Sequence, residues 1–330
     1  MAFLHGDLPL RITSHRNHDF SFHHLASRQY GGGRYRGNRF VPFSNHQRRL
    51  GIATMATRKL VITADDFGYC PEVDQAIVDL FRDSLITATT VISASPHLSA
   101  HSDDLISFSP QTGLHVVLSS DRGNSAWRPS SLEMRRIMPT FPDDPTQIDP
   151  ATSEQIKPEL EAQLQALKDM GFSPNRLDSH SGTLYGLSGP SFIGESLQFC
   201  ADHNLGFRLP RSLAMFVGDQ VPEHLMRAHS QAITFADLLH IPLPQEIASN
   251  QRPIADIPNY ESLRESYLRM LDQFPEGTSE LFLHPAYDSD IAREKFGSAW
   301  QKRVWELQLL RDPLWQKALD RSDIELVAAW

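Results

Sequence analysis

Two adjacent aspartates follow a short apolar run near residue 60. Residues 60–64 are rich in β-branched side chains, which favour a buried strand, and a Phe-Gly pair after the two acids ends it. Asp65 and Asp66 therefore stand where a strand gives way to a loop, and parallel α/β proteins gather their reactive residues at that edge. The alternative is structural: the two acids cap and solvate the start of a helix expected from about residue 72.

Histidines accompany three later apolar segments in a similar way. His115 lies inside the run 112–118, His180 follows the segment 175–179, and His284 ends the run 280–283 just before a proline. A single histidine of this kind is more often structural than a ligand. In a parallel barrel, however, the ends of the strands converge on one face, so these positions together predict one metal and acid–base site.

One carboxylate and two imidazoles would leave coordination positions open on a divalent ion. Either Asp65 or Asp66, together with His115 and His180, could supply that set. The other aspartate would then accept a proton from a water molecule whose pKa the ion lowers. His284 could donate a proton to the leaving group. This arrangement predicts hydrolysis of an amide or an ester.

Several further residues have two readings. Asp178 either orients a ligand histidine or caps the turn before it. Trp127 and Tyr185 either stack on a sugar ring or pack in the core, and packing is the more frequent role of such aromatics. Arg303 and Glu306 are spaced for an ordinary i,i+3 contact on a helix.

The elements that would position these residues alternate along the chain from residue 58. The sequence predicts strands at 88–93, 206–210 and 324–329. It predicts helices at 72–84, 261–274 and 300–320 (broken near 312), and one that begins at 153 or at Pro158 and stops at Gly171. Residues 120–150 are expected to form a long loop over the site. Alternation implies a parallel sheet, and the first strand lacks a dinucleotide-binding glycine motif. We therefore expect a distorted, TIM-barrel-like (β/α) barrel in one catalytic domain, residues 55–330.

The composition narrows the classes of partner. The 330 residues are 40% hydrophobic and carry a net charge of −9, which argues against a nucleic-acid partner for the folded part. No apolar run approaches the roughly 18 residues that a membrane helix needs. Two cysteines give neither a disulfide framework nor a zinc signature. Soluble enzymes of this kind often form homodimers, but no coiled-coil seam can be read here.

Residues 1–54 differ from the rest. They hold eight arginines, no lysine and two aspartates, a net charge of +6. We expect a disordered basic extension or leader. If Met55 is the true start of translation, the protein is expected in the cytoplasm. If the segment is a transit peptide, the protein is expected in the mitochondrion or another organelle. A basic tail that binds nucleic acid is a third, weaker reading.

Four motifs in this order resemble those of the YdjC-like (ChbG) carbohydrate deacetylases: residues 64–68 (ADDFG), 113–115 (GLH), 178–180 (DSH) and 284–285 (HP). The resemblance covers residues 58–330. It implies a βα-barrel hydrolase that uses a divalent metal, Mg or Zn, to remove N-acetyl groups from an acetylated amino sugar or chitooligosaccharide. The family pattern implies Asp65 as the base, Asp66, His115 and His180 as metal ligands, His284 as the general acid, and Arg208 near the substrate.

One feature departs from that family. Many members continue from Asp-Ser-His into further histidines, whereas residues 181–183 here are Ser-Gly-Thr. The departure points to a subgroup with a different acyl or sugar pocket. Two other functions compete with deacetylation. A glycosidase would need paired carboxylates, but adjacent strand residues point to opposite faces, so Asp65 and Asp66 are not expected to flank one bond. A carbohydrate-binding or regulatory protein without catalysis is the other.

Overall fold

The computed structural model describes residues 58–98, 102–120, 127–148, 153–187, 189–218, 220–321 and 323–330. The strands are β1 (Arg58–Phe67), β2 (Ala88–Val91), β3 (Thr112–Val116), β4 (Arg176–Ser179), β5 (Gly206–Phe207), β6 (Ile247–Ala248), β7 (Gly277–Leu283) and β8 (Ile324–Leu326). The helices are α1 (Pro71–Arg82), α2 (Ser102–Ile106), α3 (Leu132–Ile137), α4 (Ser153–Asp169), α5 (Ile193–His203), α6 (Glu223–Leu238), α7 (Tyr260–Gln273), α8 (Asp290–Phe296), α9 (Trp300–Leu310) and α10 (Pro313–Leu319).

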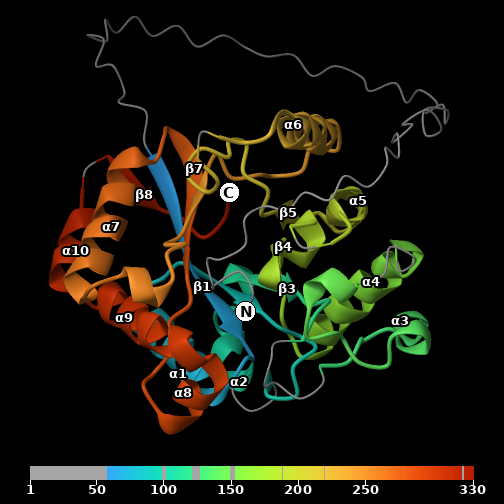
Figure 1. Cartoon of the computed structure of the whole chain (residues 1–330), viewed down its shortest axis with the longest axis horizontal. Coiled ribbons are helices and arrows are strands. Elements are labelled where there is room, and N and C mark those ends of the chain that lie inside the picture. Colours follow the sequence, from blue (N-terminus) through green and yellow to red (C-terminus); the bar gives the residue numbers. More distant parts are fainter. Residues whose placement is uncertain are drawn as a thin grey trace, which may run out of the picture. The chain divides into compact units, whose positions relative to one another are not determined.

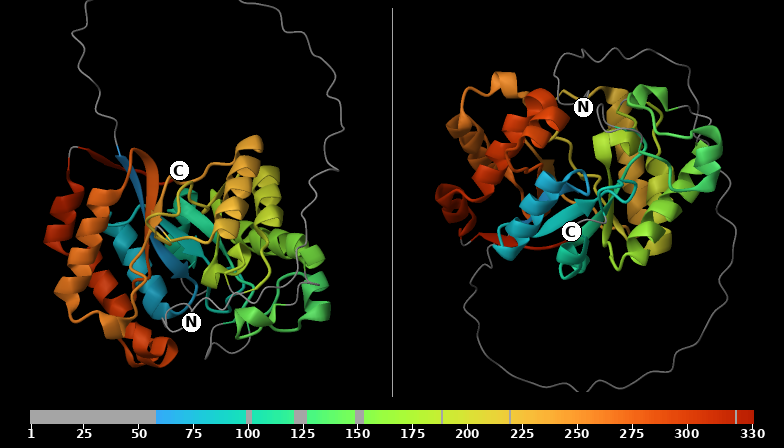
Figure 2. Two further views of the ribbon diagram at one scale, coloured as in Figure 1. Left: turned by 45° about the horizontal axis from the view of Figure 1, so that its top comes forward. Right: turned by 90° about the horizontal axis from the view of Figure 1, so that it is seen from below.

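All paired strands of the sheet are parallel, in the order β5-β4-β3-β2-β1-β7-β6. The last strand, β8, pairs with residues 58–60 of β1, and β2 pairs with residues 63–67 of the same strand. Helices α7, α9 and α10 lie beside β1 and β7, and α4 and α5 lie beside β3 to β5 (Figures 1 and 2). The alternation of strand and helix read from the sequence therefore gives the layered arrangement it predicts.

The curled sheet closes on itself through irregular backbone rather than through a regular ladder. Three backbone N–H groups of the β5 side donate to carbonyls before β6: Phe207 to Pro242 at 3.0 Å, Arg211 to Pro244 at 2.9 Å and Ser212 to Gln245 at 3.0 Å. The expected fold class, an α/β distorted barrel, is thus confirmed. Its two shortest strands, β5 and β6, lie at this seam.

Strand β1 has two faces of different chemistry. Leu60, Ile62 and Ala64 belong to the main apolar core under the helices. Thr63 and Asp65, on the alternate positions, are fully or almost fully buried but make polar contacts inside the barrel. The barrel interior is therefore lined by hydrogen-bonding groups at this strand, unlike the branched apolar layers that usually fill such barrels.

The structure corrects part of the sequence reading. Residues 120–150 hold helix α3 and a short 3₁₀ helix at 145–147, so they are more than a loop. The buried carboxylate of Glu159 accepts hydrogen bonds from the backbone N–H groups of Ser130 and Ser131, which ties the start of α3 to α4. Helix α4 begins at Ser153, and Pro158 lies inside it. The break near residue 312 is confirmed, because Asp312 caps α10.

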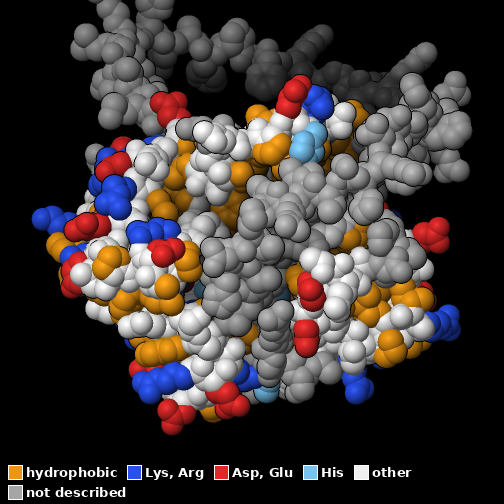
Figure 3. Space-filling model, viewed as in Figure 1, with side chains coloured by type: hydrophobic (Ala, Val, Ile, Leu, Met, Phe, Trp, Pro, Cys, Tyr) orange, Lys and Arg blue, Asp and Glu red, His pale blue; other side chains and the backbone are white. Residues whose placement is uncertain are grey.

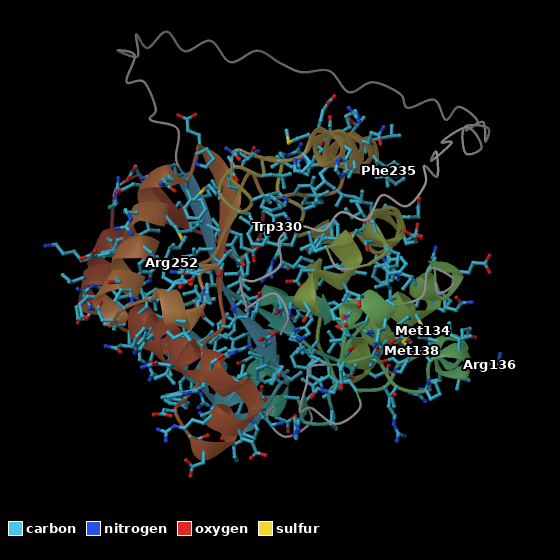
Figure 4. The ribbon with its side chains drawn as sticks, viewed as in Figure 1. Met134, Arg136, Met138, Phe235, Arg252 and Trp330 are labelled. Carbon is cyan, nitrogen blue, oxygen red and sulfur yellow. The ribbon has the colours of Figure 1, made fainter. Side chains whose placement is uncertain are left out.

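The C-terminal Trp330 covers the end of the barrel at which the strands begin. The indole Nε1 of Trp330 donates to the carbonyl of Pro242 at 3.0 Å, and the Arg176 guanidinium lies 5.3 Å from the Trp330 ring. Figure 4, compared with Figure 1, shows Trp330 between β7 and β5. Gly113 makes room for Arg176, because a Cβ there would lie 2.8 Å from the Arg176 side chain. The carboxyl ends of the strands, which carry the candidate site residues, therefore lie at the other end of the barrel.

The predictions for residues 1–54 lie outside the described residues. Within the part of the chain that the structure describes, no helix is long and apolar enough to span a membrane. On the face seen in Figure 3, basic and acidic side chains of the described residues are interspersed.

Candidate metal centre at the carboxyl ends of the strands

Both aspartates of the first motif turn into the barrel, contrary to the expected alternation. The register of β1 against β2 is irregular between Ala64 and Phe67, and Asp66 has a φ of +80°. A bulge with a residue at positive φ re-aims the side chain that follows. Asp65 and Asp66 are 2% and 1% exposed. The expectation that adjacent acids face opposite ways is therefore wrong here, because the pairing of β1 with β2 is irregular at these two residues.

Asp66, His115 and His180 come together as one buried cluster. Asp66 Oδ1 lies 3.2 Å from His115 Nε2 and 3.1 Å from His180 Nδ1, and the two ring nitrogens are 3.3 Å apart. Three atoms bonded to one tetrahedral or octahedral ion at about 2.0–2.1 Å lie about 2.9–3.4 Å from one another. The three side chains therefore have the spacing of one face of a metal coordination shell.

The protonation states of the two rings decide how this triangle is held together. The Nδ1 atom of His115 lies 2.8 Å from Asp178 Oδ1, so a neutral His115 donates there and turns the Nε2 lone pair toward Asp66 Oδ1, where two acceptors then face each other. If both ring nitrogens of the triangle carry protons, both can donate to Asp66 Oδ1. A bound cation would take the place of these protons, and the residues present fit a divalent ion of the kind that imidazole and carboxylate bind.

The pKa of His115 reflects the same geometry. Burial by itself would lower that pKa, but the carboxylates of Asp178, Asp66 and Asp65 raise it to about 10. A proton on the ring can thus supply part of the positive charge that a bound cation would supply. The contact between His115 and Asp178 joins neighbouring positions of β3 and β4. The carboxylate of Asp178 therefore contacts the His115 ring, and the orienting role of Asp178 stays a prediction.

Arg208, just after β5, links three carboxylates. It donates to both oxygens of Asp65 at 2.8 and 2.9 Å and to both oxygens of Glu280 at 2.8 and 3.0 Å, and it pairs with Asp178. Arg208 is 5% exposed. Burial would raise the pKa of Asp65, but Arg208 and His115 lower it. The structure thus directs the guanidinium of Arg208 into the barrel, and its expected place near the substrate stays a prediction.

Asp66 is held as a carboxylate by a second arginine. Arg303 Nη2, from α9, donates to Asp66 Oδ2 at 2.7 Å. Burial would raise the pKa of Asp66, but Arg303 and the two histidines hold it well below its usual range. The linked carboxyl groups of Asp65, Asp66, Asp178 and Glu280 thus outnumber the two arginines that bind them, Arg208 and Arg303. Burial raises the pKa of Glu280, against the charges of Arg208 and Arg176.

His284 is the accessible histidine of the site. It follows β7, and its side chain is 28% exposed, against 4% and 7% for His115 and His180. Its backbone N–H donates to Glu306 Oε2 at 2.7 Å, and its Nδ1 lies 4.0 Å from the same oxygen. Burial lowers the pKa of His284, and the charges of Asp66 and Asp65 oppose that shift.

The aromatic candidates have packing contacts. Trp127 is 2% exposed, and its ring centroid lies 5.4 Å from that of His180 and 5.6 Å from that of Tyr69. The Tyr185 hydroxyl donates to the backbone carbonyl of Arg208 at 2.8 Å. Trp127 thus packs beside His180 of the metal triangle and is too buried to stack on a sugar ring. Tyr185 supports the segment that carries Arg208. A sugar contact of Tyr185 stays a prediction.

The sequence pattern did not point to Glu280, and it predicted the wrong partner for Arg303. Glu280 is a charged residue within an apolar strand, on the same face as His284, and that position was a readable signal. Arg303 and Glu306 do not pair with each other. Glu306 accepts from the hydroxyl of Tyr267 at 2.7 Å, whereas Arg303 reaches Asp66. Nothing in the spacing of α9 could show that one turn of helix faces the cluster.

Comparison with known protein families gives a match over most of the chain. A family described as YdjC-like protein matches residues 59–321. The chain belongs to the YdjC-like family. The motif resemblance and the strand-end cluster both lie within the matched region.

Named relatives align with most of the chain. A carbohydrate deacetylase of Enterococcus faecalis is 22% identical over 82% of this chain and 97% of its own length. A carbohydrate deacetylase of Mus musculus is 25% identical over 82% and 93%. A chitooligosaccharide deacetylase of Salmonella typhimurium is 24% identical over 77% and 90%. A crystal structure from Enterococcus faecalis, provisionally assigned to cellobiose-phosphate cleavage, superposes with a TM-score of 0.60 at 21% identity, over 82% of this chain and 97% of that one. It shows a shared fold.

Proposed function

We propose that this YdjC-like protein is a metal-dependent hydrolase that removes an N-acetyl group from an acetylated amino sugar or oligosaccharide. The observation that carries the proposal is the triangle of Asp66, His115 and His180, with edges of 3.1–3.3 Å, at the mouth of the barrel. The names of the deacetylase relatives support the substrate class. The catalytic domain in this proposal is residues 55–330.

Asp66, His115 and His180 would hold the divalent ion, either Mg or Zn. The ion, when bound, would polarise the amide carbonyl and lower the pKa of a water molecule. In a neutral His115, a proton on Nδ1 that is donated to Asp178 would leave Nε2 free for that role.

Asp65 is the proposed base. Its Oδ1 accepts from Arg208 Nη2 and from the Thr90 hydroxyl, and its Oδ2 accepts from Arg208 Nη1. Among the described residues Oδ2 has one fewer donor, so it is the atom that we assign to receive the proton. Arg208 keeps the carboxylate ionised and fixed, which a base needs before each turnover, at the cost of some basic strength.

His284 is the proposed general acid. Of the site histidines it has the largest exposed fraction, so a leaving amine can approach its ring. Burial and the charge of Arg303 lower the pKa of His284, and the charges of Asp66 and Asp65 oppose that shift only in part. The acid role therefore requires that the bound substrate shifts the ring toward its protonated form. Glu306 holds the backbone of His284 and fixes its position at the end of β7.

A glycosidase fits the site less well. Such an enzyme needs one protonated carboxylic acid and a second carboxylate across the scissile bond. Asp65 and Asp66 both have lowered pKa values, and each is engaged by an arginine. Neither is therefore suited to donate a proton at neutral pH. A sugar-binding protein without catalysis remains an outcome of the test below.

The test is acetate release from a panel of N-acetylated mono- and oligosaccharides, using protein stripped with chelator and reloaded with Zn, Mn, Co or Mg. We expect release that disappears with chelator and returns with metal. Asp65→Asn should lower kcat by about 10²- to 10⁴-fold. Asp83→Asn, at an exposed position after α1, is the matched control and should behave like the parent.

Three results would contradict the proposal. Equal acetate release by the Asp65→Asn variant would remove the base. Products of shortened chain length would favour a glycosidase. Tight sugar binding without turnover under every metal would favour a binding protein.

A further inference from the structure

The two oxygens of Asp66 have different partners. Oδ1 faces His115 and His180 at 3.2 and 3.1 Å, and Oδ2 accepts from Arg303 Nη2 at 2.7 Å. One carboxylate thus belongs to the candidate metal triangle through one atom and to a guanidinium through the other. This division decides how many coordination positions Asp66 can occupy.

Arg303 is held firmly in this position. Its residue is 6% exposed, and its guanidinium carbon lies 4.0 Å from the ring centroid of Phe296 and 5.6 Å from that of Tyr69. The two rings are themselves 5.0 Å apart. The guanidinium is therefore fixed by aromatic side chains of the α8 end and of the loop after β1, and it has little freedom to leave Asp66.

Packing does not explain why an arginine is there. Among the described residues, Arg303 Nε and Nη1 are buried without a hydrogen-bond partner. Burying unpaired N–H groups costs stability, and an apolar side chain of similar length would avoid that cost. Local costs of this kind are expected at functional sites. The contact with Asp66 Oδ2 accounts for the charge together with the two aromatic rings beside the guanidinium.

We propose that Arg303 is a positioning residue that keeps Asp66 a one-oxygen ligand and lowers the affinity of the site for its cation. The inference rests on the proposed function. With Oδ2 bonded to Arg303, Asp66 fills one coordination position and leaves others for water and the substrate carbonyl. The fixed positive charge also repels the cation. Arg303 therefore weakens the binding of the cation but keeps coordination positions open for water and the substrate carbonyl.

The test compares variants of the full chain. Arg303→Met removes the charge at similar length, Arg303→Gln keeps a neutral polar side chain, and Arg303→Lys keeps the charge. Lys302→Met is the matched control: Lys302 is a buried cation on the same helix, and it donates to the carbonyls of Asn250 and Arg252. The readouts are the Kd for Co²⁺ by competition with a chelating dye, the visible absorption of the Co²⁺ protein, and kcat and KM for acetate release.

We expect Arg303→Met and Arg303→Gln to bind Co²⁺ on the order of 10-fold more tightly, because each removes a fixed positive charge beside the cation. Their absorption spectra should change as Asp66 takes a second position, and kcat should fall while KM changes little. Arg303→Lys should return all readouts toward the parent, and Lys302→Met should bind Co²⁺ like the parent.

Equal or weaker Co²⁺ binding by both neutral variants would overturn the inference. If only one of the two neutral variants folds, as judged by circular dichroism, that folded variant decides. Failure of the proposed function looks different: the parent itself would then bind no Co²⁺ or release no acetate. The two failures are therefore separable in one set of measurements.

Discussion

The buried carboxyl group of Asp74 should make the free energy of unfolding depend on pH. It lies in the first turn of α1, fully buried, and its Oδ1 accepts from the backbone N–H of Gly68 at 2.6 Å. Its Oδ2 has no partner among the described residues. Burial raises the pKa of Asp74 to about 7, against the hydrogen bond from Gly68, with a smaller contribution from Glu72. The perturbation is Asp74→Asn, which removes the charge and keeps the acceptor.

The sign follows from proton binding. Between the unfolded pKa of 3.8 and the folded value of about 7, the folded chain binds more protons at Asp74 than the unfolded chain does. Stability from this group is therefore lost as pH rises through that window. Each pKa unit is worth about 1.4 kcal/mol, which gives a loss on the order of 4 kcal/mol above the window, about half of it already incurred at pH 5.5.

The assay is urea denaturation of parent and variant at pH 5.5 and pH 8.5. We expect Asp74→Asn to be more stable than the parent at pH 8.5, with a difference that grows by about 2 kcal/mol between the two pH values. Asp83→Asn, at an exposed position, should show no such growth. A difference that is constant between the two pH values, or a variant that loses stability at pH 8.5, would refute the reasoning.

Two further predictions concern the centre itself. Asp178→Asn should weaken Co²⁺ binding by about 10- to 100-fold, because the His115 ring loses the carboxylate 2.8 Å from its Nδ1; an unchanged Kd in the dye assay would contradict this. His284→Asn should lower kcat by about 10²- to 10⁴-fold and leave the Co²⁺ affinity unchanged, because His284 lies outside the metal triangle. A parallel loss of Co²⁺ binding would place His284 among the ligands.

The sequence by itself determined the fold class and the neighbourhood of the site. Strand-like runs that end in or contain Asp65, Asp66, His115, His180 and His284 are local patterns, and parallel strands must bring their carboxyl ends to one mouth. Alternation of strand and helix then left a distorted barrel as the arrangement that unites them. Short elements with weak periodicity, such as β6, were missed because two residues carry too little pattern.

Only the tertiary structure decided which groups touch. The bulge that turns Asp66 inward depends on how β1 pairs with β2, and no property of the residues 64–67 taken alone requires it. Arg208 lies 143 positions from Asp65, and Arg303 lies 237 positions from Asp66, so no spacing rule connects them. Charge pairing across a barrel is set by packing of the whole chain, whereas strand ends are set by local side-chain pattern.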